Sequence, residues 1–462
     1  MKKLETSRRV LLIILSTLSL ASQIGAYAFC WFHWYKEMVA MQFWIKGDLL
    51  MIAIYAVLLF FFSRMYGGMR IGYLKAWEVF FSQGFATLCV NVISYAITSL
   101  MSAKLVSPQY FLLLMLADVV WIALWTSISQ GLYSMLFPPR DMLLVSGERS
   151  VESILEKFAG RPDKYNICKC MNIKEGYEAV CAEVLKRYDA IVLWDIPLED
   201  RNKILKFCYG HSIRVYMMPK IPDVLIRGTT EMHIFDTPIY LTREYALNVE
   251  QRFSKRVIDL ICSVLLFVIA SPVMLLTAIA VKCYDGGPVL YKQVRCTLNG
   301  KEFKILKFRS MRVDAEKDGV ARLATKNDDR ITPIGKFIRE VRIDEFPQLI
   351  NILAGDMSFI GPRPERPEII KQYIEDMPEF AFRTKVKAGL AGYAQVYGKY
   401  NTTPYDKLKL DLTYIENYSV WLDIKLMLLT LKVLITPDST EGVDKEQKTA
   451  LKNTENKTDS EE

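Results

Sequence analysis

Charge is distributed very unevenly along this chain, and that distribution limits what the chain can fold into. Residues 1–140 contain 16 charged side chains, or 11%, whereas the other 322 residues contain 94, or 29%. The low value comes from four long apolar stretches, at 10–32, 44–63, 77–101 and 110–137. Each approaches or exceeds the ~20 residues that a helix needs to cross a bilayer. We therefore predict four membrane-spanning helices over 1–140, and the pattern excludes a wholly soluble chain and a disordered one.

The basic residues around these stretches predict an orientation. One set of flanks carries Lys2, Lys3, Arg8, Arg9, Arg64, Arg70, Lys75 and Arg140, and the opposite set carries only Lys36, Lys46 and Lys104. Because basic flanks favour the cytoplasm, both ends of the bundle are expected there, and the protein is expected to be a multi-pass cell-membrane protein. Asp118 lies inside the fourth stretch without a basic partner, so we interpret it as packing between helices rather than marking a polar pathway.

From residue 141 to 252, short apolar runs alternate with polar helical segments. Strands are predicted at 142–147, 165–170, 190–195 and 214–219, with helices around 150–160, 176–187 and 198–210. Alternating β and α units predict a doubly wound parallel α/β domain of Rossmann-like type. The first strand ends in Ser146-Gly147-Glu148-Arg149, which lacks the glycines of a dinucleotide-binding turn. We therefore interpret 141–252 as a regulatory or oligomerising domain.

A fifth apolar segment, 257–281, is long enough to cross the bilayer, but its flanks argue against crossing. Lys255 and Arg256 precede it, and further basic residues follow it, at Lys282, Lys292 and Arg295. Both ends therefore favour the cytoplasm. Ser271-Pro272 lies near its middle, where a proline can kink or break a helix. We predict a re-entrant membrane helix with a break at Ser271 and Pro272; the alternative is a straight fifth span.

Region 284–437 combines adjacent acids with arginines. Thr332-Pro333 can begin a short helix that runs to about Val341, and Pro347 can begin a second one that Gly355 can end. Asp344-Glu345 would lie next to the start of the second helix. Free backbone amides at the start of a helix favour the binding of phosphate, and arginine side chains suit a diphosphate. Four arginines lie near the acid pair in the sequence, at Arg339, Arg342, Arg363 and Arg366. One carboxylate could attack phosphorus while the other holds a divalent ion or a proton. The alternative is that the two acids only match the charge of the helix end.

Several ordered motifs of this region resemble the bacterial sugar transferase family, the monotopic polyprenyl-phosphate phosphoglycosyl transferases. They are KILKFRSM (304–311), DDRITPIGKFIRE with RIDEFPQL and GDMSFIGPRPE (328–365), and GLAGYAQVYGK (389–399). The resemblance covers about 253–437 and implies a small α-rich catalytic domain with a re-entrant membrane helix at 257–281. The four spans and the middle domain resemble the large subgroup that initiates exopolysaccharide, capsule or O-antigen synthesis.

By that resemblance, Asp344 is the nucleophile. It attacks a nucleoside-diphosphate sugar, for which a UDP-hexose is the first choice, and forms a phosphosugar-aspartyl intermediate. Undecaprenyl phosphate then accepts the sugar phosphate. Glu345 is expected to bind Mg²⁺. The resemblance implies substrate phosphate-binding residues at Arg363, Arg339, Lys307 and Arg309, and nucleotide-binding residues at Gly389, Gly392 and Gln395.

Three departures from the family pattern leave the nucleotide and the sugar open. Arg342-Ile343 stands where Ser-Leu is common, Ala388–Gly392 replaces the usual Pro-Gly-Ile-Thr-Gly, and Lys399 replaces an arginine. None of them alters the acid pair itself.

The expected partners are the two substrates and the lipid bilayer, with no nucleic acid; a homodimer and polysaccharide assembly partners stay open. A catalytically silent membrane scaffold is the alternative function. A third reading is another lipid-linked enzyme with a straight fifth span and an external site. The acidic tail, 438–462, has no apolar period and is predicted to be disordered.

Overall fold

The computed structural model describes residues 2–40, 44–242, 246–313, 330–398 and 402–435, so the predicted disordered tail lies outside the described residues. Internal contacts divide the chain into two compact units, Met1–Met218 and Pro219–Glu462. Each unit is described by itself.

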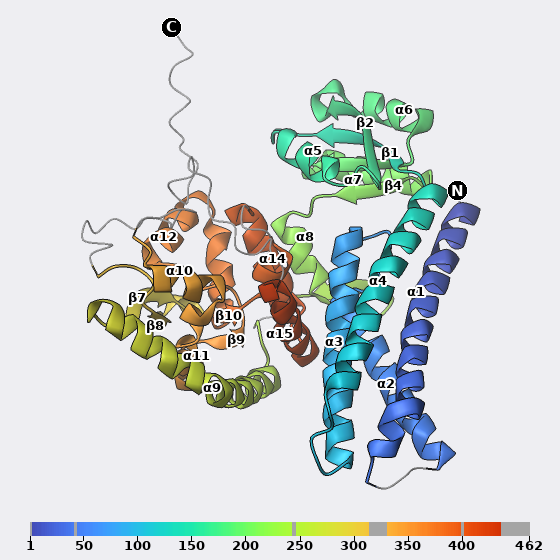
Figure 1. The fold of residues 1–462 in the computed structure, drawn as a ribbon. Coiled ribbons are helices and arrows are strands. Elements are labelled where there is room, and N and C mark those ends of the chain that lie inside the picture. Colours follow the sequence, from blue (N-terminus) through green and yellow to red (C-terminus); the bar gives the residue numbers. More distant parts are fainter. Residues whose placement is uncertain (1, 41–43, 243–245, 314–329, 399–401, 436–462) are drawn as a thin grey trace. The chain divides into compact units, whose positions relative to one another are not determined.

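The first unit begins with four long helices that run alongside one another (Figure 1). They are α1 (Lys2–Cys30), α2 (Ile45–Tyr66), α3 (Ala76–Met101) and α4 (Gln109–Leu136), and α1 continues through a π-helical turn, Trp31–Tyr35. All four are long and apolar enough to cross a membrane, as is one further helix, Val249–Asp285. The four predicted apolar helices are therefore confirmed; α1 begins eight residues before its predicted stretch, and the other ends shift by a few residues.

Polar side chains inside this bundle find partners across helices. Asp118 is 2% exposed, and the Asn91 amide donates a hydrogen bond of 2.8 Å to it. The Tyr55 hydroxyl donates in turn to the Asn91 carbonyl oxygen, also at 2.8 Å. The structure thus places Asp118 between helices, as the sequence interpretation has it, because an acid in an apolar layer needs a hydrogen-bond donor.

A parallel sheet of four strands follows the bundle, in the order β2-β1-β3-β4. Its strands are β1 (Arg140–Ser146), β2 (Tyr165–Asn172), β3 (Ala190–Trp194) and β4 (Arg214–Met217). The helices between them are α5 (Glu152–Ala159), α6 (Tyr177–Arg187) and α7 (Leu198–Gly210). All seven predicted elements are present within a few residues of their predicted ends.

Strand β1 shows why helices cover both faces of the sheet. Leu143 and Val145 pack in one core with residues of α6 and α7, whereas Met142 and Leu144 pack in another core with residues of α5. Gly147, at the end of β1, lies so close to Asp195 that an added Cβ would be 2.0 Å from the Asp195 carbonyl oxygen. Close backbone packing, rather than a ligand, explains this glycine.

The second unit starts with α8 (Ile221–Arg227) and a hairpin of β5 (Thr230–Ile234) and β6 (Thr237–Leu241). Ile221 and Val224 of α8 pack in one core with Leu408 and Leu412. Helix α8, which lies in the part of the sequence predicted to belong to the middle domain, therefore makes its core contacts in the second unit.

The rest of the second unit is a small, mostly helical domain. Its strands are β7 (Leu290–Cys296), β8 (Glu302–Phe308), β9 (Ser358–Ile360) and β10 (Gly389–Ala391). Its helices are α10 (Pro333–Glu340), α11 (Gln348–Ala354), α12 (Pro367–Asp376), α13 (Tyr393–Tyr397), α14 (Pro404–Glu416) and α15 (Val420–Ile435), with short 3-10 helices at Leu298–Gly300, Ile343–Glu345 and Pro378–Lys385.

The long helix α9 (Val249–Asp285) lies along this domain and curves as one continuous ribbon (Figure 1). One face is buried at Lys255, Asp259, Ser263, Ala270, Thr277 and Val281. The opposite face is apolar and exposed, as at Ile261, Leu265, Val268 and Leu276. Spacings of four and seven residues keep the buried positions on one side.

The predicted break at Ser271 and Pro272 is corrected by the structure, because α9 remains helical through both residues. Proline cannot donate to the carbonyl four residues earlier, that of Val268. The Ser271 hydroxyl donates to this carbonyl instead, at 2.8 Å. The serine thus satisfies the acceptor that the proline leaves open, and the helix tolerates Pro272.

Candidate active site

The acid pair lies in a tight turn between α10 and α11. Thr332 caps α10 by accepting a hydrogen bond of 2.9 Å from the Gly335 amide, and α11 ends at Gly355 in the left-handed conformation. Both helices thus begin and end close to the predicted residues. Arg342 has φ of +61°, which is rare for a residue with a side chain. This backbone turn directs the following 3-10 helix, Ile343–Glu345, which carries both carboxylates.

Glu345 is held by two cations that come from distant parts of the chain. Lys307 Nζ, from β8, and Arg363 Nη2, from the loop after β9, both donate to Glu345 Oε1 at 3.0 Å. Burial acts to raise the pKa of Glu345, but Lys307, Arg363 and Arg342 outweigh burial and lower it. The structure thereby brings together three of the predicted site residues, and the lowered pKa keeps Glu345 ionised.

Asp344 has the opposite electrostatic character. It is 9% exposed, and its Oδ1 is buried with no hydrogen-bond partner among the described residues. Burial raises the pKa of Asp344, the neighbouring charge of Glu345 raises it further, and Lys307 and Arg339 act against both. A buried carboxylate oxygen without a partner is costly to keep, so such an atom is a candidate for function. The two adjacent acids therefore differ. Two cations balance the negative charge of Glu345, whereas Asp344 has an oxygen available for reaction.

Arg363 is positioned through its backbone. The guanidinium of Arg383, which is 3% exposed, donates to the Arg363 carbonyl at 3.0 Å, and Arg295 donates to the Pro364 carbonyl at 3.1 Å. Arg383 is fixed in turn by an ion pair of 2.8 Å with Asp411. Neither arginine belongs to the predicted site, and no motif in the sequence distinguishes them from surface charges.

The glycines predicted to bind a nucleotide have a packing role in the structure. An added Cβ on Gly389 would be 2.1 Å from the Gly361 amide, and one on Gly392 would be 2.2 Å from the Gly361 carbonyl oxygen. These glycines let β10 and its following turn press against the loop that carries Arg363. Gln395, at the same turn, has a buried Oε1 with no hydrogen-bond partner in the described part of the chain. Gln395 therefore presents a polar side-chain atom that no described residue uses.

The two remaining cations of the predicted phosphate site have different surroundings. Arg339, in the last turn of α10, is half-buried and acts on Asp344 through its charge. Arg309 instead pairs with Asp285 at the end of α9, through both terminal nitrogens. Because its guanidinium is committed to Asp285, we interpret Arg309 as a clamp on α9 rather than as part of the cluster around Glu345.

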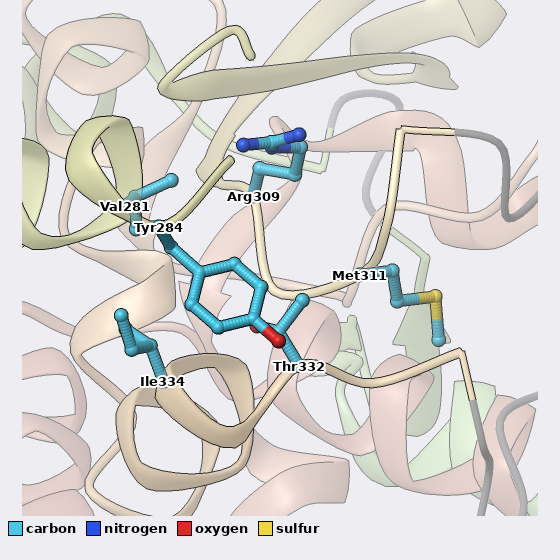
Figure 2. A pocket seen from close by; sticks show the side chains of 6 residues that line it. All are labelled: Val281, Tyr284, Arg309, Met311, Thr332 and Ile334. Carbon is cyan, nitrogen blue, oxygen red and sulfur yellow. The ribbon is translucent and has the colours of Figure 1, made fainter. Parts of the chain in front are cut away.

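Arg309 also lines a small hollow at this end of α9 (Figure 2). The Tyr284 ring lies in it, among Val281, Met311, Thr332 and Ile334. Its lining is largely apolar and includes neither acid of the pair. The hollow is therefore not the place where Asp344 would react.

The basic pair before the apolar segment has internal partners that the sequence does not reveal. Lys255 Nζ, which is buried, donates to Asp423 at 2.7 Å, to the Ile360 carbonyl at 2.8 Å and to the Tyr414 hydroxyl at 3.0 Å. Arg256 donates to the Ile352 and Leu353 carbonyls at the end of α11. Lys255 thus joins α9 to β9, directly before the loop of Arg363. These two cations, which the sequence analysis uses as membrane flanks, serve the catalytic domain's own fold.

Comparison with known proteins gives a consistent result. The family model described as bacterial sugar transferase matches residues 250–437. The chain is 36% identical over 264 residues to a UDP-N-acetylgalactosamine-undecaprenyl-phosphate N-acetylgalactosaminephosphotransferase of Aeromonas hydrophila. This alignment covers 54% of this chain and 60% of that protein. It is 39% identical over 211 residues to a UDP-glucose:undecaprenyl-phosphate glucose-1-phosphate transferase of Escherichia coli K12, covering 45% and 44%.

A third relative is matched over most of its length. A protein of Caulobacter vibrioides with the same glucose-1-phosphate transferase description is 40% identical over 190 residues, which are 40% of this chain and 71% of that protein. The first two alignments span only about half of the relatives' length.

Proposed function

The chain belongs to the bacterial sugar transferase family, and from this membership we propose that it transfers a sugar 1-phosphate from a nucleoside-diphosphate sugar to undecaprenyl phosphate. The relatives' descriptions name UDP-sugars as donors, which supports a UDP-hexose for this chain. The product would be the first lipid-linked sugar of an exopolysaccharide, capsule or O-antigen. The observation that carries this proposal is the buried Asp344 Oδ1, which has no hydrogen-bond partner among the described residues and lies next to a carboxylate that two cations bind.

In the proposed first step, Asp344 Oδ1 attacks the β-phosphorus of the donor. The bond between that phosphorus and the bridging oxygen breaks, and the nucleoside monophosphate (UMP for a UDP-sugar) leaves with the bridging oxygen and its electron pair. In the second step, a phosphate oxygen of undecaprenyl phosphate attacks the phosphosugar-aspartyl phosphorus and frees Asp344. Covalent catalysis divides one difficult transfer into two easier ones. Low exposure protects the intermediate, because water has little access to the Asp344 carboxylate.

Cations around the acid pair supply the binding energy for phosphate. Lys307 and Arg363 converge on one oxygen of Glu345, and Arg339 acts on Asp344. A diphosphate that enters beside Glu345 would share these donors, and Arg363 can contact phosphate through two parallel N–H groups. Gln395 Oε1 is the atom that we assign to the nucleotide, since it is buried and has no partner among the described residues.

The donor set also suits Mg²⁺. This ion binds through one or two carboxylates together with substrate phosphates, and Glu345 with the neighbouring Asp344 offers such oxygens. Among the described residues, no group of three or more His, Cys, Asp or Glu side chains gathers, so we propose that Glu345 and the substrate hold the ion together. When bound, Mg²⁺ would neutralise charge on the diphosphate and on the leaving nucleotide.

We also propose that α9 is re-entrant, with both ends on the cytoplasmic side together with the catalytic domain. Lys255 at its start is bound by β9 and α15, whereas Val281 near its end packs with Phe308 and Ile338 of the same domain. A crossing helix would separate these ends by the ~30 Å hydrocarbon core. Exposed apolar side chains on the other face of α9 suit a lipid contact.

Accessibility labelling tests this topology. In a variant that keeps Cys283 as its only cysteine, we expect a membrane-impermeant maleimide to label inverted vesicles and not intact cells. Arg252→Cys with Cys283 replaced should behave in the same way, because it lies at the other end of α9. Lys104→Cys, between α3 and α4, is the matched control and should label only from outside. Opposite-side labelling of residues 252 and 283 would show a straight span.

Release of nucleoside monophosphate tests the proposed activity. Purified protein with undecaprenyl phosphate, Mg²⁺ and a panel of nucleotide sugars should release the monophosphate of one donor and form the matching lipid-linked sugar phosphate. Chelation by EDTA should stop both, and added Mg²⁺ should restore them. If no donor gives more release than the Asp344→Asn variant, the enzyme proposal fails and the membrane-scaffold alternative gains support.

A further inference from the structure

A buried lysine in the first unit has no counter-ion among the described residues. Lys164, just before β2, is 8% exposed, and its ammonium group lies over the rings of Tyr73 and Tyr165, at 4.3 and 5.2 Å from their centres. Among the described residues, no acceptor or carboxylate pairs with its Nζ. A buried ammonium without a partner is unfavourable, since burial removes its hydration.

Three arginines surround the same place. Arg161 donates to the Tyr73 carbonyl at 2.7 Å, and the amide of Arg140 donates to the Lys164 carbonyl at 3.1 Å. Arg8 lies over the Tyr133 ring at 5.0 Å, and Tyr133 packs directly on Gly72, the neighbour of Tyr73. Burial first, and then the charges of Arg161, Arg140 and Arg8, lower the pKa of Lys164 to about 8.

The described acids nearby are used by other groups and do not reach the Lys164 ammonium. Asp163 is bound by Arg161 through two hydrogen bonds of 2.9 Å, so its charge is already used. Glu78 acts on Arg161 from the start of α3, where its carboxylate accepts from the Lys75 amide. Neither of these acids contacts the Lys164 ammonium, so no described carboxylate balances its charge.

The place of this cluster in the fold indicates what anion it fits. Tyr73 lies between α2 and α3, Arg8 lies in the first turns of α1, and Arg140 follows the end of α4. The apolar spans begin at Thr6 and Ala76 and end at Leu136, so the cations lie at one boundary of the membrane. Phosphate groups of lipids lie at this level, and each Lys or Arg near an anionic membrane surface adds about 1 kcal/mol of binding.

We propose that Lys164, Arg161, Arg140 and Arg8 form a phosphate-binding site at this end of the four-helix bundle, separate from the candidate active site. Its shared chemistry is a phosphate anion, either the headgroup of an anionic phospholipid or a free phosphate. Bound phosphate would supply the missing negative charge and would join α1 and the α2–α3 connection to the sheet domain. Removing the Lys164 and Arg161 charges would leave the active-site residues untouched.

Native mass spectrometry of the full-length protein tests the site. Protein exchanged into detergent with equal amounts of phosphatidylglycerol and phosphatidylcholine should retain phosphatidylglycerol with a preference of about tenfold. The Lys164→Gln/Arg161→Gln variant should lose most of this preference. Lys174→Gln/Lys206→Gln removes two exposed charges from the same unit and should keep it.

A thermal-unfolding arm distinguishes the two sources of phosphate. If the headgroup is the ligand, phosphatidylglycerol raises the wild-type Tm and 10 mM inorganic phosphate in phosphatidylcholine does not. If free phosphate raises the Tm by itself, and the charge-removing variant loses that rise, the ligand is a soluble anion. A wild-type protein with no lipid preference and no phosphate response overturns the proposal, and this readout does not depend on whether any variant folds.

Discussion

Replacing Asp344 with asparagine is expected to abolish transfer and to leave the fold at least as stable. Activity should fall more than about a thousandfold, because the amide cannot serve as the nucleophile. Stability should stay equal or rise by on the order of 1 kcal/mol, because the charged carboxylate is buried, beside Glu345, with one oxygen unpaired. Nucleoside monophosphate release and thermal unfolding in detergent measure the two effects.

The pH dependence gives this prediction a sign. The pKa of Asp344 is raised in the fold above its ordinary value of 3.8, so the protonated form is the better tolerated one. At neutral pH the wild type bears the cost of the charge and Asp344→Asn does not. As the pH falls toward 3.8 the wild type takes up the proton, and the difference in Tm should disappear.

Asp376→Asn is the matched control, since Asp376 is an exposed acid of the same domain. It should change neither activity nor Tm. An Asp344→Asn protein that retains transfer, or that unfolds well below the wild type at neutral pH, would contradict the roles assigned to this side chain.

Replacing Lys255 with methionine is expected to cause the largest loss of stability, about 3–5 kcal/mol. Its ammonium is buried and binds Asp423, whose side chain is 3% exposed. Without the lysine, Asp423 stays buried and loses its cation, and it keeps the Tyr414 hydroxyl, which donates to it at 2.7 Å. Because the Ile360 carbonyl loses the Lys255 donor as well, the loop of Arg363 should also become less ordered, so activity should fall with stability.

Two comparisons isolate this effect. Lys292→Met removes an exposed cation of β7 and should cost little. The Lys255→Met/Asp423→Leu double variant should recover part of the loss, because no charge then remains buried. Chemical unfolding of all three variants in one detergent measures the coupling between the two side chains. If Lys255→Met alone is as stable as Lys292→Met, Lys255 does not stabilise the fold and serves only as a basic flank of the membrane segment.

Local patterns predicted many features of this molecule. The four apolar helices, the four parallel strands and their helices, and the helices that flank the acid pair all follow from periodicity, caps and turn residues. Thr332 and Gly355, for example, act where the sequence places them because a cap needs only neighbours along the chain. Asp344, Glu345, Lys307 and Arg363 were selected by motif, and the structure brings the last three into direct contact.

Other features depend on residues that are far apart in the sequence. The sequence does not show that Asp285 pairs with Arg309, or that Asp423 binds Lys255 from 168 residues later. It does not show either that Gly389 and Gly392 pack against Gly361. A single sequence does not distinguish a charged residue or a glycine that contacts a ligand from one that contacts another part of the protein.

The sequence by itself determined that the chain has four apolar helices, an alternating α/β segment and one acid pair among basic residues, because each of these is a pattern of neighbours. Only the tertiary structure decided which cations are available. In the structure, Lys255, Arg256 and Arg309 bind partners within the protein, and Lys307 and Arg363 bind Glu345. Asp344 Oδ1 has no hydrogen-bond partner among the described residues. The physical reason is that charge pairing acts across space and not along the chain.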